Sequence, residues 1–237
     1  MRAWQIAGTA AVGAYAANAF PSLWYHWLLA QKTARWLTGE GDASGIALTF
    51  DDGPDPKSTP QILDLLDAAG AKATFFMLGS QVELYPWVAQ EVAARNFEIG
   101  LHGHWHKVHL LRSQASINYD LARGASAIAE TTGQSPTFFR PPYGCLTKAT
   151  LDAAHRLGLR TVLWGTWGRD WRKTATPVSV MADLRHRLKP GSTVLLHDSD
   201  CTSYPGAFRA TLDALPALIE TAASNKLAIR ALRDHGF

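Results

Sequence analysis

The chain has 237 residues, of which 47% are hydrophobic and 18% are charged, and its formal net charge is +3. This length and composition are typical of one globular α/β domain with a large core. Because the charge is small and no block of basic residues occurs, nucleic-acid binding is not indicated.

Residues 1–38 are predicted to be a membrane-anchor or signal-like segment with an amphipathic extension. No Asp, Glu, Lys or Arg lies between Arg2 and Lys32, and Trp residues flank a short apolar stretch, as in membrane spans. A retained anchor, a signal segment cleaved after Ala17-Asn18-Ala19 and a helix packed on the domain all stay open. We expect a membrane-anchored protein with its domain on the extracytoplasmic face, or alternatively a secreted one.

Strand-like and helix-like segments alternate from residue 45 onwards, within a predicted catalytic domain of residues 39–237. This alternation predicts parallel strands with helices outside. The fold class is therefore α/β: a distorted (β/α) barrel of about seven strands, complete or incomplete, with an N-terminal apolar helix. The predicted strands are 46–50, 72–78, 97–101, 137–140, 159–164, 192–197 and 227–232, and the predicted helices are 58–70, 86–95, 116–132, 147–157, 177–188 and 208–223.

Polar side chains of catalytic types follow these strands. In α/β barrels the carboxyl ends of the strands form the face where active sites are built, and core packing does not explain five segments converging on it. The residues are Asp51 and Asp52 after the first strand, His102 after the third, Arg140 after the fourth, Asp170 in the loop after the fifth, and His197 at the end of the sixth.

The pair Asp51-Asp52 and the HxxxH pair His102 and His106 indicate a metal site. One carboxylate and two imidazoles are the ligand set of a catalytic metal with an open position. Adjacent residues at a strand end point in different directions, so one carboxylate can hold an ion while the other moves a proton. The HxxxH spacing is weak evidence without this context.

Structural alternatives exist for several of these residues. The two carboxylates could only cap the next helix, but Asp55, Ser58 and Thr59 lie closer to its start. His104 and His109 are expected to be loop residues rather than ligands.

The chain has two cysteines, Cys145 and Cys201, each a few residues beyond a polar cluster. Two are too few for a disulfide framework. A single disulfide between them and two unpaired thiols both stay open.

Five motifs in order make the sequence similar to a known family. They are Thr-Phe-Asp-Asp-Gly-Pro, His-x-x-x-His, Arg-Pro-Pro-Tyr-Gly, Asp-Trp and Leu-Leu-His-Asp. Together they resemble the polysaccharide deacetylases of carbohydrate esterase family 4, with the NodB-type deacetylase domain, over about residues 45–235. The resemblance implies a distorted (β/α) barrel and a metal-dependent hydrolase that removes N-acetyl or O-acetyl groups from a sugar polymer, oligosaccharide or glycolipid.

The resemblance also implies roles for the metal and base residues. Asp51 would be the general base, and Arg140 would pair with it. Asp52, His102 and His106 would bind one divalent metal ion, either Zn²⁺ or another ion such as Co²⁺.

Further roles follow from the resemblance for the acid and the substrate. Asp170 would orient His197, the general acid. Tyr143 would supply a backbone N–H to the oxyanion, and Trp171 and Leu195 would enclose the acetyl methyl group.

The sequence departs from the family pattern beside the first metal histidine. Gly103 stands where the family commonly has Ser or Thr, and Leu101 where it often has Asn. The expected partners are an acetylated carbohydrate or glycolipid and a membrane, with no nucleic acid. The motifs do not separate chitin-type, peptidoglycan, xylan and glycolipid substrates, and they do not predict the oligomeric state.

Three other functions are compatible with parts of this residue pattern. A phosphoesterase would use the same metal on a barrel, and a non-haem iron oxygenase would use the same ligand trio. A non-catalytic carbohydrate-binding protein would have no need of both an acid and a base.

Overall fold

The structure is a computed structural model, and it describes residues 35–237. Residues 1–34 of the predicted anchor or signal segment (1–38), which include the predicted N-terminal apolar helix, lie outside the described residues. Among the helices of the described part, none combines the length and the apolar character that a membrane span requires.

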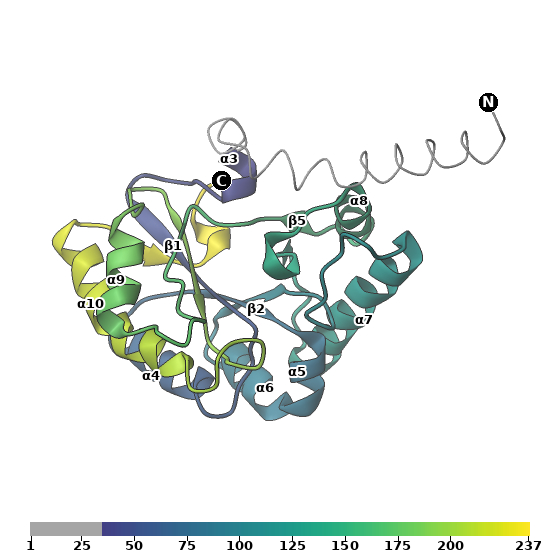
Figure 1. Cartoon of the computed structure of the whole chain (residues 1–237), viewed down its shortest axis with the longest axis horizontal. Coiled ribbons are helices and arrows are strands. Elements are labelled where there is room, and N and C mark those ends of the chain that lie inside the picture. Colours follow the sequence, from purple (N-terminus) through teal and green to yellow (C-terminus); the bar gives the residue numbers. More distant parts are fainter. Residues whose placement is uncertain (1–34) are drawn as a thin grey trace.

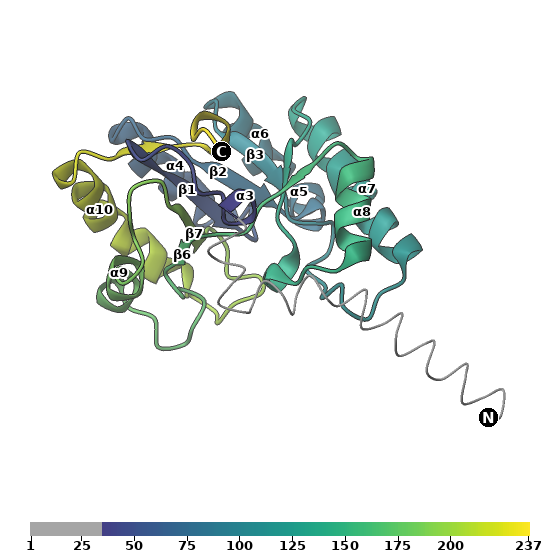
Figure 2. The ribbon, with the colours of Figure 1, turned by 90° about the horizontal axis from the view of Figure 1, so that it is seen from above.

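The strands of the described residues form one parallel sheet (Figures 1 and 2). Its order is β5-β4-β3-β2-β1-β7-β6, and β8 pairs with the start of β1. Because β5 and β6 lie at opposite ends of this order, the barrel does not close. The predicted distorted and incomplete (β/α) barrel is therefore confirmed. The strands are β1 (Gly45–Asp51), β2 (Thr74–Met77), β3 (Glu98–Leu101), β4 (Phe138–Phe139), β5 (Arg160–Thr161), β6 (Thr166–Trp167), β7 (Thr193–His197) and β8 (Ala228–Arg230).

Helices cover the outside of the sheet (Figures 1 and 2). Most agree with the predicted ranges, but two short helices were not predicted, one of four residues at Arg35–Thr38 and one of six residues directly after β2 at Gly79–Leu84. The described α-helices are α3 (Arg35–Thr38), α4 (Thr59–Ala68), α5 (Gly79–Leu84), α6 (Pro86–Ala94), α7 (Gln114–Thr132), α8 (Lys148–Arg156), α9 (Pro177–Arg185) and α10 (Phe208–Ser224).

The segment 159–164, predicted as one strand, is instead the crossing between the two ends of the sheet. The Val162 N–H donates to Phe139 in β4, whereas the Gly165 N–H donates to Thr193 in β7. The predicted strand therefore contains only the two residues of β5, and β6 begins beyond its end, at Thr166.

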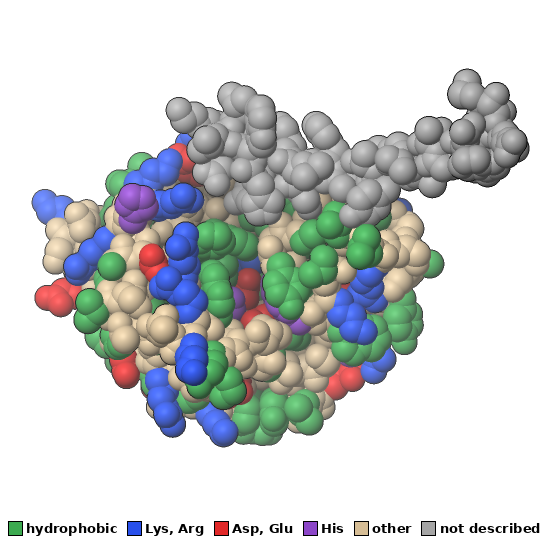
Figure 3. All heavy atoms as spheres, in the orientation of Figure 1, with side chains coloured by type: hydrophobic (Ala, Val, Ile, Leu, Met, Phe, Trp, Pro, Cys, Tyr) green, Lys and Arg blue, Asp and Glu red, His purple; other side chains and the backbone are tan. Residues whose placement is uncertain are grey.

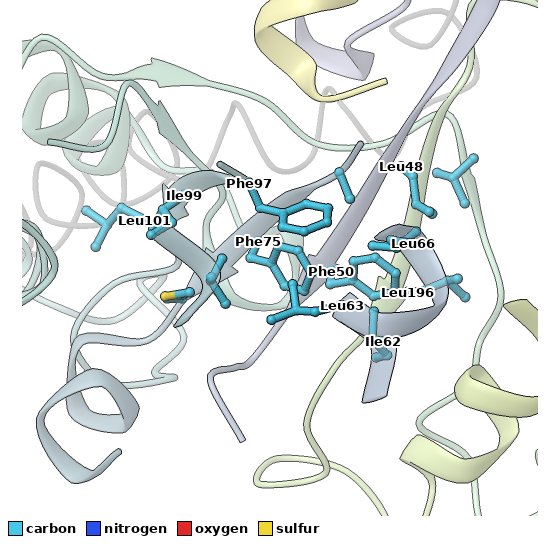
Figure 4. Close-up of a cluster of buried hydrophobic side chains, with 14 of the residues drawn as sticks. Leu48, Phe50, Ile62, Leu63, Leu66, Phe75, Phe97, Ile99, Leu101 and Leu196 are labelled. Atoms are coloured by element: carbon cyan, nitrogen blue, oxygen red, sulfur yellow. The ribbon is translucent and has the colours of Figure 1, made fainter. Parts of the chain in front are cut away.

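The centre of the core is aromatic. Phe50 in β1 stacks on Phe75 in β2 with ring centroids 5.1 Å apart, and Phe97 meets Phe75 edge-on at 5.6 Å. Leu63 and Leu66 of α4 pack onto the same cluster (Figure 4). Because every residue of β1 is buried, the carboxyl end of this central strand is held in place from both sides.

The start of helix α4 differs from the expectation in detail. Ser58 is its N-cap residue, but the Ser58 side chain makes no capping bond. Its hydroxyl instead donates to the Asp198 carbonyl over 2.5 Å, and Asp55 Oδ1 accepts from the N–H groups of Lys57 and Ser58. The hydroxyl thus ties the helix start to the end of β7.

The two cysteines are not bonded to each other. Neither Cys145 nor Cys201 forms a disulfide, and the Cys201 thiol lies 3.4 Å from the Asp52 carbonyl oxygen. The alternative of a single disulfide between them is therefore not present in the structure.

Helix α3 belongs to the packed part of the domain. Leu37 is buried with Leu146 and Leu163, and the Leu163 N–H donates to the Leu37 carbonyl over 2.7 Å. The predicted boundary after residue 38 stays a prediction, but a truncated form that keeps helix α3 and this contact must begin no later than Arg35.

Candidate active site

Asp52, His102 and His106 converge at the carboxyl ends of β1 and β3. The Nε2 atoms of both histidines lie 3.4 Å from Asp52 Oδ1. Asp52 and His102 are almost completely buried, and the three ligand atoms lie within 4.8 Å of one another. In the described part of the chain this is the one group of three such residues close enough to hold an ion.

The surroundings of these three residues suit a cation. The His102 Nδ1–H donates to the Arg140 carbonyl over 2.8 Å, which leaves Nε2 with its lone pair facing Asp52. Asp52 Oδ2 accepts from the Thr202 hydroxyl. Within the described structure, Asp52 Oδ1 is buried and has no hydrogen-bond partner. A buried carboxylate oxygen facing two imidazole nitrogens fits a divalent metal ion.

Asp51 lies beside this group, with its Oδ2 3.9 Å from His102 Nε2, and is held by a buried arginine. Arg140 Nη1 donates to Asp51 Oδ1 over 2.7 Å and to Thr49 Oγ1 over 2.8 Å. Arg140 Nη2 donates to the Leu163 carbonyl over 2.7 Å. Burial raises the pKa of Asp51 to about 6, although the charges of Arg140 and His197 oppose the rise. A carboxylate with such a pKa is suited to accepting a proton near neutral pH.

His197 and Asp170 form the second acid–base pair. The His197 Nδ1–H donates to Asp170 Oδ1 over 2.8 Å, and the His197 backbone N–H donates to Oδ2 over 2.7 Å. The Thr211 hydroxyl also donates to Oδ2, over 2.5 Å. Burial opposes the imidazolium, but the Asp170 carboxylate outweighs burial and raises the pKa of His197 to about 10. His197 is therefore a proton donor below that pH.

A pocket of about 220 Å³ connects these groups. Figure 3 shows the corresponding hollow on the face of the molecule, with hydrophobic side chains on both sides of red and purple atoms at its floor. The lining residues are Asp51, Asp52, His102, His106, Tyr143, Gly144, Trp164, Trp167, Trp171, Leu195, His197, Thr202 and Ser203.

Aromatic side chains form two walls of the pocket. The Trp171 ring lies 5.4 Å from His197, and Trp167 lies between Trp171 and Trp164 at 5.8 and 5.4 Å. On the other side the Tyr143 ring lies 4.3 Å from His106 and is 60% exposed. The pocket is therefore open to solvent between two aromatic walls.

Three residues at the pocket have a backbone conformation that side chains disfavour. The φ angles of Asp52, Tyr143 and Arg169 are 78°, 59° and 47°. Such non-glycine residues each cost about 1–3 kcal/mol and cluster at functional sites. The unusual backbone around this pocket is a second indication, independent of side-chain chemistry, that function was selected here.

All ten residues that the sequence singled out lie in or directly behind this one pocket. Eight of them line it, whereas Arg140 and Asp170 stand behind Asp51 and His197. The roles given to them stay predictions. His104 and His109 lie in the loop after β3 and outside the metal group, as expected, and both are buried.

The hydroxyl residues that hold the charged side chains were not predicted from the sequence. Thr49 binds Arg140, Thr202 binds Asp52 and Thr211 binds Asp170. Thr49 could have been noticed as a polar residue inside a buried strand. Thr202 and Thr211 carry no comparable signal, because their partners are distant in the sequence.

Comparisons with known proteins agree with this geometry. The profile of the polysaccharide deacetylase family matches residues 38–162. A peptidoglycan-N-acetylglucosamine deacetylase from Bacillus cereus is 40% identical over 155 residues, covering 65% of this chain and 72% of that protein. A chitooligosaccharide deacetylase from a Bradyrhizobium strain is 32% identical over 192 residues, covering 75% of this chain and 87% of that protein.

Solved structures show the same fold. A peptidoglycan N-acetylglucosamine deacetylase in complex with a substituted N-hydroxybenzamide has a TM-score of 0.77 and 28% identity, covering 83% of this chain and 90% of that one. A family 4 carbohydrate esterase from Streptomyces lividans in complex with acetate has a TM-score of 0.69 and 29% identity, covering 78% and 91%. With the profile matching more than half of its residues, the chain belongs to the polysaccharide deacetylase family of carbohydrate esterases.

Proposed function

We propose that this enzyme removes the N-acetyl group from N-acetylglucosamine units of a cell-wall glycan. One observation carries the proposal: Asp51 and His197 are register partners on the neighbouring strands β1 and β7, beside the Asp52, His102 and His106 group. A base and an acid thus flank one candidate metal site, as hydrolysis of an amide requires.

Asp52, His102 and His106 would hold the metal ion. The proposed ion is Zn²⁺, because one carboxylate and two imidazoles with an open position are its usual catalytic ligands; Co²⁺ would fit the same donors. When bound, such an ion supplies Lewis acidity that polarises the acetyl carbonyl and lowers the pKa of water. The Thr202 hydroxyl on Asp52 would fix the orientation of the carboxylate.

Asp51 would act as the general base. It takes the proton of the attacking water at the oxygen that does not face Arg140. The Arg140 guanidinium is completely buried and holds the other oxygen at 2.7 Å, so the carboxylate cannot rotate away. With a pKa of about 6, Asp51 is a stronger base than an ordinary exposed carboxylate, and it is still largely ionised at neutral pH.

His197 would act as the general acid. Its Nδ1–H is committed to Asp170, so Nε2 carries the proton that passes to the departing sugar amine. Since Asp170 stabilises the imidazolium, His197 keeps this proton until the C–N bond breaks. Acid–base catalysis of this type contributes about 10²- to 10⁴-fold.

Three further residues would position the acetyl group. The backbone N–H of Tyr143 would donate to the developing oxyanion, a contact that contributes about 3–4 kcal/mol for a well-placed donor. Trp171 and Leu195 line the same pocket and would enclose the methyl group. The free product is acetate and an amino sugar.

Positive charge beside the pocket favours an acidic glycan such as peptidoglycan over a neutral chitooligosaccharide. Arg169 lies over the Trp167 ring at 5.3 Å, and Lys173 lies over the Tyr204 ring at 5.5 Å. Figure 3 shows blue side chains gathered at one side of the hollow. Turnover of a carboxylated substrate should therefore fall with salt more steeply than turnover of a neutral one.

Membrane attachment through residues 1–34 remains part of the proposal. It rests on the uncharged stretch from Ala3 to Gln31 with its flanking aromatic residues. Full-length protein should pellet with membranes and resist a salt wash, because the attachment would be apolar rather than electrostatic. Full-length protein that stays in the supernatant would contradict it.

Acetate release from a panel of substrates tests the function directly. The panel contains peptidoglycan, N-acetylglucosamine oligomers, acetylated xylan and an acetylated glycolipid, together with a phosphate ester as a control. We expect the highest kcat/KM on peptidoglycan. Phosphate release without acetate release would favour the phosphoesterase alternative, and no release from any substrate would favour a binding protein.

A further inference from the structure

The loop that carries the two candidate metal histidines rests on one face of helix α7. Asp120 and Gly124 are four residues apart and share this face. Asp120 Oδ1 accepts from the Trp105 N–H over 3.1 Å. A Cβ on Gly124 would lie 2.9 Å from the carbonyl carbon and oxygen of Gly103. Both helix positions thus contact the loop backbone between His102 and His106.

Asp120 is completely buried, and one of its oxygens has no hydrogen-bond partner among the described residues. The Arg112 guanidinium forms an ion pair with Asp120, with Nη1 3.6 Å from Oδ1, and His109 Nε2 lies 3.6 Å from Oδ2, but neither approaches within hydrogen-bond distance. A carboxylate buried this way is costly unless the fold requires it. Asp120 lies behind the metal loop and binds its backbone, which would explain why a buried carboxylate is present at this position.

Gly103 and Asp120 fit each other. The φ angle of Gly103 is +87°, in the region that favours glycine. A Cβ on Gly103 would lie 2.9 Å from Asp120 Oδ2, so the carboxylate stands against the space that a side chain would use. The departure from Ser or Thr at this position is therefore matched by an acidic residue on α7.

We propose that Asp120 is a positioning residue that sets the geometry of the metal loop. It accepts a hydrogen bond from the residue that precedes His106, and its other oxygen lies against the space beside the residue that follows His102. Fixing these two backbone positions fixes the imidazole rings, whose centroids are 5.2 Å apart. The inference rests on the metal site of the proposed function.

Metal affinity measures this role without relying on turnover. Zn²⁺ binding is measured by competition with a chromogenic chelator on full-length protein and on the variants Asp120→Ala and Asp120→Asn. We expect Asp120→Ala to weaken Zn²⁺ binding by about 10- to 100-fold, the usual effect of losing a residue that orients metal ligands. Asp120→Asn should lose less, because its amide oxygen still accepts from Trp105. Glu130→Gln, at an exposed position of the same helix, is the control and should bind normally.

A double-mutant cycle with Gly103 tests the contact itself. Gly103→Ala alone should weaken Zn²⁺ binding, because the new methyl group meets Asp120 Oδ2. In the Asp120→Ala background the same change should cost clearly less, since the carboxylate is gone. The strain of a positive φ is common to both backgrounds and cancels, so the non-additivity reports the contact.

The outcomes separate this inference from the proposed function. If Asp120→Ala and Asp120→Asn are less stable but bind Zn²⁺ within about twofold of wild type, Asp120 is only structural and the inference is overturned. If Asp120→Ala does not fold, unchanged affinity in both Asp120→Asn and Gly103→Ala overturns it. Wild-type protein that releases acetate but binds neither Zn²⁺ nor Co²⁺ overturns the metal site together with this inference. Wild-type protein that binds Zn²⁺ but releases no acetate instead overturns the proposed function.

Discussion

The Arg140 guanidinium lies wholly inside the protein and donates to Asp51 Oδ1 over 2.7 Å. The two residues are 89 positions apart in the chain and meet because β4, β3, β2 and β1 are consecutive in the sheet. The pair places a positive charge behind the proposed base and leaves the other carboxylate oxygen on the pocket side.

Loss of this arginine should destabilise the fold. We expect Arg140→Gln to lower the free energy of unfolding by about 3–5 kcal/mol, because it leaves a buried carboxylate without its partner. Urea denaturation measures the change. Arg169→Gln, at an exposed position, should stay within about 0.5 kcal/mol. An Arg140→Gln variant as stable as wild type would show that the ion pair does not support the fold.

Substitutions of the two adjacent carboxylates should affect metal binding and turnover differently. Asp51→Asn should keep the metal and lose most of kcat, because a base must be free to take a proton. Asp52→Asn should lose both, because its Oδ1 faces the two histidine nitrogens at 3.4 Å. Metal content and kcat of both variants decide the matter. If Asp51→Asn strips the metal, the roles are shared or reversed.

Chelation should abolish activity, and added Zn²⁺ or Co²⁺ should restore it. His102→Ala and His106→Ala should each lose most of the metal affinity, because three protein ligands leave little redundancy. Activity is measured before chelation, after chelation and after each ion is added. Undiminished acetate release from chelated, metal-free protein would refute the metal site.

The pH dependence should have two limbs. The pKa of Asp51, raised to about 6 by burial, should set the acid limb of kcat/KM, and the pKa of His197 should set the alkaline limb. In Asp170→Asn the alkaline limb should move to lower pH, because the imidazolium loses its carboxylate. An unmoved limb would count against the pair.

The His197–Asp170 pair also predicts that the stability of the protein depends on pH. The pKa of His197 is raised from 6.5 to about 10, so its contribution is complete below pH 6.5 and is lost as the pH rises through about 10. The pKa of Asp170 is lowered from 3.8, since hydrogen bonds and the His197 charge outweigh burial, so its contribution is present above 3.8. The stability difference between wild type and Asp170→Asn should therefore be largest between pH 3.8 and pH 6.5. Thermal unfolding at several pH values measures it, and a constant difference up to pH 10 would exclude this coupling.

The sequence by itself determined the fold class and the candidate metal ligands. Apolar strands alternate with helices at a regular spacing, and Asp51-Asp52 and His102 stand directly at strand ends. The carboxyl ends of parallel strands meet at one face, so a local pattern was enough to bring these residues together. The family motifs also indicated the deacetylase class, because each is a short segment at or after a strand end that can be recognised without knowing the tertiary structure.

The tertiary structure alone decided which residues support that face. The contacts of Thr49 with Arg140, Thr211 with Asp170 and Asp120 with Trp105 each join two elements. Periodicity in the sequence reports which face of an element is buried, but not which polar partner lies opposite. The partner depends on strand order and helix packing, and these are set by the whole core rather than by any one segment.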